Sequence, residues 1–254
     1  TFAQSSSVTS TNYDENDITV TDTVNGITTI KDHEGSNVVT DRIKVFWEEL
    51  NDSRVNVGDS IEWRVKAVLD YDDHILGSGD SLTGNLGALS WDEGNDWWEI
   101  SHSESTVTGT AIGSWSGSEA TYGITAISES ITETTGIWDR VYITATSASD
   151  NRINIGDDVD VDFTVKYEYD DTPLTDGAVT IEGASASHQG NGVWRLTDTE
   201  AEVTAKTYDT FTSTGNTFGI LVVNQNSQSE TIIWDQINIL KYGSISTGTT
   251  LQNE

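Results

Sequence analysis

The chain of 254 residues contains no cysteine, no methionine and a single proline, Pro173. The absence of cysteine excludes disulfides, thiolate metal sites, c-type haem attachment and cysteine nucleophiles. No apolar run approaches the roughly 18 residues that a membrane-spanning helix needs, and no signal peptide is visible. Because Thr1 stands where a start methionine would be, we expect a processed or excised start.

Basic residues are scarce as well. Twelve Lys and Arg face 42 Asp and Glu, which gives a formal net charge of −30. Such a surface repels nucleic acid and anionic lipid, so we expect neither as a partner. The acidity suits a high-salt habitat, a cation-binding surface or solubility alone. A hydrophobic fraction of 35% with 9 Trp is enough to build real cores.

Motifs for catalysis are missing too. No Gly-x-Ser-x-Gly elbow, phosphate loop or His-Glu-x-x-His occurs. Paired carboxylates are expected by chance among 42 acids. The histidines are scattered, with no pair at metal-ligand spacing: His33, His74, His102 and His188. We therefore predict that the protein is not an enzyme.

What the chain does contain is a repeat. The stretch Ile-Trp-Asp-Arg-Val at 137–141 returns as Ile-Trp-Asp-Gln-Ile at 233–237, and in weaker form as Val-Thr-Asp-Arg-Ile at 39–43. The spacings are 96 and 98 residues, and about 100 residues is one small β domain. The repeat predicts a string of like modules, with Trp138 and Trp234 packing in the cores and at the module joints.

Each module shows the alternation of half-buried strands. Apolar residues alternate with polar ones from Ile61 to Tyr71 and again from Val159 to Tyr169, and both runs end in Tyr-Asp-Asp. About seven short strands separated by turns fit each module, without helical periodicity. This predicts an all-β fold of tandem immunoglobulin-like β-sandwiches.

The ends of the chain read as incomplete modules. We predict a flexible or donor arm over 1–16, the last strands of an incomplete module over 17–40, sandwiches over 41–138 and 139–234, and the first strand of a further module over 235–254. The chain is then either a segment of a longer array or a subunit completed by its neighbours. In the second case residues 236–250, with the arm 1–16, would donate strands and generate a linear polymer, because open sheet edges recruit strands.

Residues 154–183 carry a resemblance to a known group. The pattern Asn-x-Gly-Asp, an alternating strand, then Tyr-x-Tyr-Asp-Asp-Thr-Pro-Leu-Thr-Asp-Gly-Ala-Val-Thr-Ile-Glu-Gly resembles the bacterial and archaeal immunoglobulin-like repeats of large surface proteins. Such repeats build S-layers, adhesins and extracellular filaments, and the acidity resembles archaeal surface proteins. The resemblance covers about 41–238 and implies an extracellular location at the cell surface. The first module departs from the pattern, with His-Ile-Leu-Gly-Ser-Gly at 74–79.

Acidic turns are the candidate metal sites. In an antiparallel sandwich the second strand ends where the first begins, so each Tyr-Asp-Asp turn should lie near the Asp at the module joint. Converging carboxylates suit Ca²⁺, a hard ion that takes six to eight oxygens. The alternative is that these residues cap turns or solvate an acidic surface. The candidate ligands are Asp41, Asp72, Asp73, Asp139, Asp170 and Asp171.

Three tryptophans have no counterpart in the second module: Trp91, Trp97 and Trp115. Close to Asp92 and other acids, they would either stack against surface glycans or cover a neighbouring subunit. Asn51-Asp-Ser53 also forms an N-glycosylation sequon in a predicted loop.

These observations predict a structural subunit of an extracellular surface filament or S-layer, which polymerises with itself through strand complementation. The alternative is an adhesin or carbohydrate-binding tandem of immunoglobulin-like modules.

Overall fold

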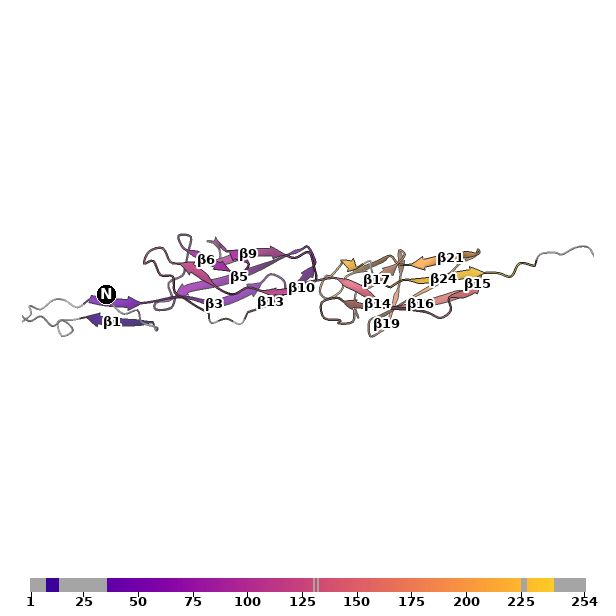
Figure 1. Cartoon of the computed structure of the whole chain (residues 1–254), viewed down its shortest axis with the longest axis horizontal. Helices are drawn as coiled ribbons and strands as arrows, with labels where there is room; N and C mark the ends of the chain where they lie inside the picture. The colour runs from indigo at the N-terminus through magenta and orange to yellow at the C-terminus, as the bar shows by residue number, and fades with distance from the viewer. Residues whose placement is uncertain (1–7, 14–35, 130, 132, 225–227, 240–254) are drawn as a thin grey trace, which may run out of the picture. The chain divides into compact units, whose positions relative to one another are not determined.

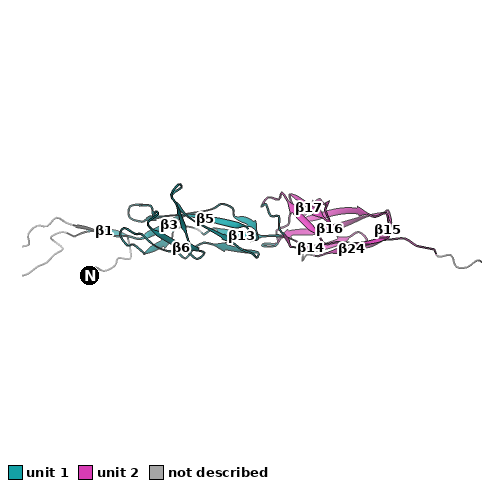
Figure 2. Cartoon of the chain, turned by 90° about the horizontal axis from the view of Figure 1, so that it is seen from above, with its two compact units in different colours: residues 1–140, 168–170, 218–222 teal, residues 141–167, 171–217, 223–254 magenta. Residues whose placement is uncertain are grey.

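The computed structural model describes residues 8–13, 36–129, 131, 133–224 and 228–239, which form β-strands and no helix (Figure 1). Among these residues no helix could therefore span a membrane. The chain divides into two compact units (Figure 2). Unit 1 comprises residues 1–140, 168–170 and 218–222, and unit 2 comprises residues 141–167, 171–217 and 223–254. The prediction of an all-β fold of immunoglobulin-like sandwiches is confirmed.

Unit 1 has a sheet of five strands in the order β12-β3-β5-β9-β8 and two sheets of three, β10-β13-β4 and β11-β6-β7. The strands are β3 (Ile43–Leu50), β4 (Arg54–Asn56), β5 (Ser60–Leu69), β6 (Ser81–Gly84), β7 (Gly87–Ala88), β8 (Ser90–Asp92), β9 (Trp97–Ser103), β10 (Thr108–Ala111), β11 (Ser116–Ser118), β12 (Ile127–Glu129) and β13 (Thr135–Asp139).

Unit 2 repeats this topology strand for strand: β19-β20-β16-β14-β23, β15-β24-β21 and β18-β17-β22. Its strands are β14 (Val141–Ala148), β15 (Arg152–Asn154), β16 (Asp158–Tyr167), β17 (Ala178–Ile181), β18 (Ala184–Ser185), β19 (Ser187–Gly190), β20 (Val193–Thr199), β21 (Thr204–Tyr208), β22 (Phe211–Thr214), β23 (Val223–Asn224) and β24 (Glu230–Asp235). We predicted about seven strands per module; the described residues form more because short strands flank the long ones.

The long central strands follow from the alternating sequence. In β5, Ile61, Trp63 and Val65 are fully buried, while the residues between them are half-buried. The strand β16 shows the same pattern. Even the irregularity recurs: the pairing shifts between Val45 and Trp47 in β3 and between Ile143 and Ala145 in β14. The period-2 pattern therefore fixes which face of each strand enters the core.

The two cores use different aromatic pairs, at different repeat positions: Trp63 repeats as Val161, and Phe163 repeats Val65. In unit 1, Trp63 packs against Trp138 with ring centroids 5.9 Å apart. In unit 2, Phe163 packs against Phe211 at 5.3 Å. One further tryptophan has the same repeat position in both units, and its indole N–H donates to a backbone carbonyl. In unit 1 this residue is Trp98, which donates to Leu76 at 3.2 Å.

Near the N-terminus, β1 (Thr9–Tyr13) pairs antiparallel with β2 (Ser36–Thr40). The strand β2 has the repeat position of β13 and β24, because Asp41 follows it as Asp139 and Asp235 end theirs. Part of the predicted arm is therefore a strand. The predicted strands between 17 and 35 and the tail 240–254 lie outside the described residues, and residues 236–239 are in no strand.

Candidate functional site

The strand β4 brings a buried arginine beside a buried aspartate. β4 pairs parallel with β13, so that Arg54 lies opposite Ile137 and Asn56 opposite Asp139. Arg54 is 6% exposed and Asp139 is fully buried. A buried charge is costly unless it is paired and hydrogen-bonded, so the two side chains depend on each other.

The guanidinium of Arg54 donates to two carboxylates. Its Nε and Nη2 donate to Oδ2 of Asp139 at 2.9 Å and 2.5 Å. Its Nη1 and Nη2 donate to the two oxygens of Asp170 at 3.0 Å and 3.1 Å. The ring of Phe218 lies 4.5 Å from the guanidinium carbon. Burial lowers the pKa of Arg54, but the hydrogen bonds to Asp170 and Asp139 outweigh it, and the net shift is upward.

Backbone groups complete this arginine site. Oδ1 of Asp139 accepts the N–H groups of Arg140 at 2.8 Å and Tyr169 at 2.9 Å. Asn56 presents an oxygen that accepts from the N–H of Leu221 at 2.6 Å and of Val222 at 3.0 Å. The segments 168–170 and 218–222, which belong to unit 1, are thus held by a charge pair, an aromatic contact and an asparagine. The arrangement therefore holds two segments of the chain's own backbone in place.

Of the predicted calcium ligands, Asp139 and Asp170 do come together, but both contact Arg54. Asp171 accepts a hydrogen bond from the hydroxyl of Tyr142. Within the described residues no group of three or more His, Cys, Asp or Glu is placed to hold a metal ion. Calcium binding stays a prediction, which calorimetry at millimolar calcium would test.

The acidic turns also have a structural role. Asp73 and Asp171 have φ of 56° and 60°, the left-handed region that aspartate tolerates better than most residues. Asp72 accepts the N–H of His74 at 3.2 Å, and Asp41 accepts the N–H of Arg42 at 2.7 Å.

The predicted joint tryptophans lie in sandwich cores. Trp138 and Trp234 are fully buried, and their indole N–H groups donate to the carbonyls of Asp59 at 2.8 Å and Asp157 at 3.1 Å. In the Trp-Asp repeat it is therefore Asp139, next to Trp138, that belongs to the polar site around Arg54. Asn51, the sequon asparagine, is exposed between β3 and β4, and its side-chain oxygen accepts the N–H of Glu62 at 2.8 Å. Glycosylation there stays a prediction.

Of the three unmatched tryptophans, Trp91 and Trp115 pack against the core of unit 1. Trp97 instead stacks on Trp47, with centroids 6.1 Å apart and planes 14° from parallel. Cations cover this pair: Arg64 lies 4.8 Å from the ring of Trp97, and Lys66 lies 5.5 Å from the ring of Trp47. Both tryptophans are partly exposed.

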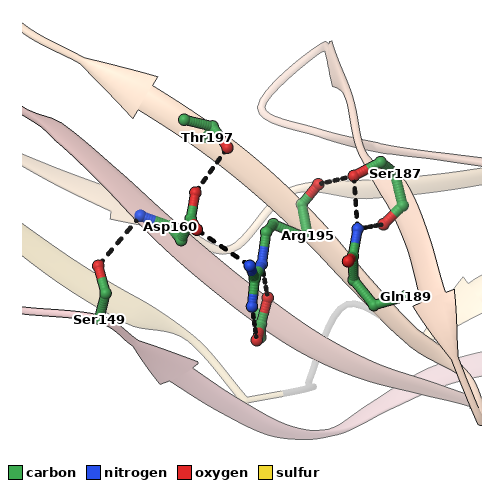
Figure 3. A network of polar contacts seen from close by, with 7 residues as sticks. Ser149, Asp160, Ser187, Gln189, Arg195 and Thr197 are labelled. Carbon is green, nitrogen blue, oxygen red and sulfur yellow. Dashed lines mark hydrogen bonds and ion pairs between the residues drawn. The ribbon is translucent and has the colours of Figure 1, made fainter.

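Unit 2 has a polar network on the corresponding sheet (Figure 3). Arg195 binds Asp160 at 3.0 Å and Asp162 at 2.7 Å. Thr197 donates to Asp160 at 2.6 Å, and Ser149 accepts the N–H of Asp160 at 3.2 Å. The bond to Asp162 is the main cause that raises the pKa of Arg195. The repeat positions of Trp47 and Trp97 are Ala145 and Val193, so the stacked pair has no counterpart in the described part of unit 2.

Sequence reasoning missed Arg54, Asn56, Phe218 and Trp47. A signal for the first two was present, because Arg-Val-Asn-Val-Gly-Asp at 54–59 returns as Arg-Ile-Asn-Ile-Gly-Asp at 152–157. Phe218 repeats Tyr122, since Thr-Phe-Gly-Ile at 217–220 matches Thr-Tyr-Gly-Ile at 121–124, but nothing in the sequence marks it as an arginine contact.

No protein-family model matches the chain, and no curated protein matches its sequence. Solved structures are similar to it at low identity. The Escherichia coli adhesin FdeC is 14% identical over 83% of this chain and 70% of its own, with a TM-score of 0.33. The Yersinia pseudotuberculosis adhesin InvE is 11% identical over 77% and 59%, with a TM-score of 0.28. Fibronectin(III)-like modules of Clostridium thermocellum CbhA are 9% identical over 74% and 93%, with a TM-score of 0.29. At these identities the similarity concerns the fold alone.

Proposed function

We propose that this protein is a non-enzymatic structural component of a cell surface, in which sandwiches of this kind associate end to end into a filament or layer. The observation that carries the proposal is the exposure of the apolar residues after β24. Ile237 and Ile239 are 94% and 88% exposed. Their repeat positions in unit 2 are Val141 and Ile143, which are 1% and 3% exposed in β14.

The same positions are also buried in unit 1, where Ile43 and Val45 of β3 are fully buried. In both units this first strand pairs with the long central strand of its five-stranded sheet. Burying one isoleucine side chain contributes about 1.5–3 kcal/mol. Residues 236–239 therefore have the sequence of a first strand, although in the described part of the chain they are in no strand. In the proposed assembly they pair with the sheet of an adjoining subunit, and the surface charge of −30 keeps the assembly soluble.

The test is deletion of the chain from Gln236, followed by sedimentation velocity. The full chain is expected to sediment as a concentration-dependent series of oligomers, and the truncated chain as a monomer. A matched variant, Ile237→Ser with Ile239→Ser, keeps the length and should lose the oligomers as well. Oligomers that persist in both variants would show that this strand does not take part in the assembly.

A second candidate is carbohydrate binding at the stacked pair Trp47 and Trp97. The pair is partly exposed on unit 1, although the indole nitrogen of Trp97 is itself buried, without a hydrogen-bond partner among the described residues. Stacking on sugar rings is a common use of surface tryptophan, but cations already cover these rings. Glycan-array binding that disappears with Trp97→Ala, while assembly is unchanged, would favour this candidate. An array without hits would remove it.

A further inference from the structure

Unit 1 contains a second copy of the surface that Arg54 contacts, and this copy is open. A cavity of about 420 Å³ lies near its N-terminal strands, and it is lined by the end of β2, the Tyr-Asp-Asp turn after β5 and the turn before β12. Three of its residues have the repeat positions of the three side chains around Arg54: Asp41 repeats Asp139, Asp72 repeats Asp170, and Tyr122 repeats Phe218. We call this cavity the Asp41 socket.

The backbone of the socket is already set as in the filled site. Oδ1 of Asp41 accepts the N–H groups of Arg42 and of Tyr71, at 2.7 Å and 3.0 Å. Gly123 has φ of 69° and its repeat partner Gly219 has φ of 66°, so the two turns share a conformation. The filled site thus serves as a template for the open one.

What the socket lacks is the cation. In the described part of the chain no arginine or lysine side chain bonds Asp41 or Asp72, since the nearby Arg42 and Lys44 both bind Asp70. Tyr122 is 75% exposed, whereas Phe218 beneath Arg54 is 40% exposed. Two carboxylates beside an aromatic ring therefore face solvent.

Among the described residues, the strand next to the socket is unpaired on the matching side. In unit 1, β4 pairs parallel with β13, with Arg54 opposite Ile137. In unit 2, β15 pairs parallel with β24, with Arg152 opposite Ile233. The equivalent strand β2 pairs with β1 alone in the described residues, and Val39, which repeats Ile137, is 43% exposed.

We propose that the Asp41 socket binds an arginine-bearing strand of a like sandwich, with the sequence Arg-(Val or Ile)-Asn, paired parallel to β2 and with its arginine opposite Val39. The guanidinium contacts Asp41 and Asp72 over the ring of Tyr122. The asparagine accepts from the N–H groups of Thr125 and Ala126, as Asn56 accepts from those of Leu221 and Val222. An open edge strand and an ion pair together give both affinity and register.

This inference rests on the proposed end-to-end association and names how one end is recognised. It also separates two occupants of the β2 edge. The tail 236–250 contains no arginine, so a tail paired with β2 would leave both carboxylates of the socket without a guanidinium. A like sandwich that carries Arg-Ile-Asn, as unit 2 does at 152–154, provides one when this strand exchanges its pairing with β24, and Arg152 its bond to Asp235, for the β2 edge and the socket.

The test uses the full chain and a labelled synthetic peptide of the sequence 150–158, Asp-Asn-Arg-Ile-Asn-Ile-Gly-Asp-Asp. Binding is followed by fluorescence anisotropy, and the amide signals of Val39, Thr125 and Ala126 are followed by NMR. Asp72→Asn, which keeps the oxygen that caps His74, is expected to weaken binding about tenfold. A peptide with citrulline for arginine should weaken binding by the same factor.

Asp73→Asn is the matched control, because it removes one charge from the same turn outside the socket. Equal weakening by Asp72→Asn and Asp73→Asn would mean general attraction to an acidic surface and would overturn the proposal. Equal binding of a tail peptide of sequence 236–250, insensitive to Asp72→Asn, would overturn it as well.

A trapping experiment detects a complex too weak for anisotropy. The chain has no cysteine, so Thr125→Cys provides a single thiol, and the peptide carries cysteine at its second asparagine. A disulfide is expected with Thr125→Cys and not with the equally exposed Ser90→Cys. Absence of both binding and trapping refutes the socket, while oligomers of the full chain would still support the proposed function. Peptide binding without oligomers of the full chain would support the socket and contradict the proposed function.

Discussion

Arg54 and Arg152 have the same repeat position but different surroundings. Arg54 is 6% exposed and binds Asp139 and Asp170, while the side chain of Arg152 is 64% exposed and binds Asp235 at 2.7 Å. Asn56 receives two backbone N–H groups, whereas Asn154 in the described residues keeps only the local bond, to Asp157 at 2.8 Å. The sequence around each arginine is nearly the same, so the difference comes from what is packed against it.

The arginine site is formed by two separate parts of the repeat, and each part alone makes only half of the contact. The strand Arg-(Val or Ile)-Asn provides a cation and an amide side chain, and the Tyr-Asp-Asp turn with the aromatic before β12 or β23 provides the other half. Arg54 contacts both parts, and all of these residues belong to unit 1. The Asp41 socket and Arg152 each present one half to solvent.

The largest expected effect is that of Arg54→Ala. This change leaves the fully buried Asp139 without a cation, and breaking a buried pair by removing one partner costs about 3–5 kcal/mol. Chemical unfolding monitored by tryptophan fluorescence would show the transition of unit 1 at lower denaturant. The matched control is Arg152→Ala, for which we expect no resolvable shift because the pair is solvent-exposed. Equal shifts in the two variants would break the comparison.

Asp139→Asn is expected to cost less, about 1–3 kcal/mol in the same experiment. The asparagine oxygen still accepts from the backbone of Arg140 and Tyr169, but its amide group now faces the guanidinium, which retains Asp170. A variant as stable as the parent would show that the charge of Asp139 contributes nothing.

Phe218→Ala should cost about 0.5–1 kcal/mol through loss of the contact between the ring and Arg54. Tyr122→Ala, at the same repeat position in the Asp41 socket, should leave stability unchanged, because no described cation lies over that ring. Thermal unfolding of both variants tests this, and a larger loss for Tyr122→Ala would contradict the open state of the socket.

The smallest effect concerns the protonation of Asp235. The hydrogen bond from the N–H of Gln236, and next the bonds from Arg152, lower the pKa of this carboxyl. A carboxyl with a lowered pKa contributes stability that is present above its unfolded value and is lost as the pH falls through its folded value. Arg152→Ala should raise the pKa of Asp235 towards its ordinary value, measured by NMR titration. An unchanged pKa would mean that the pair does not form in solution.

Much of the fold could be predicted from the sequence because the alternation from Ile61 to Leu69 reports burial. The predicted strand was two residues too long, since β5 ends at Leu69 and Tyr71 is 48% exposed. The repeat around Asp139 also marked one residue of the polar site, while the predicted calcium ligation there stays a prediction. The partner of Asp139 could not be predicted, because Arg54 lies 85 residues away and reaches it only through the parallel pairing of β4 and β13. Carboxylates alone suggested a cation but could not distinguish a metal ion from a guanidinium.

The tryptophans show a second limit. Trp138 repeats as Trp234, and both are core residues. A close-packed core position requires a side chain of a given volume, so the same residue occurs at this position in both units. Trp97 has no repeat partner, and its stacking partner Trp47 lies on a different strand of the sheet. The repeat spacing drew attention to Trp97 but not to Trp47, and spacing along the chain does not show which residues of different strands are in contact.

The most direct test of the central claim, end-to-end association of like sandwiches, is negative-stain electron microscopy of the full chain at physiological salt. We expect linear assemblies that shorten to single particles when the chain is cut at Gln236. Single particles at every concentration of the full chain, or assemblies that are unaffected by the cut, would contradict it.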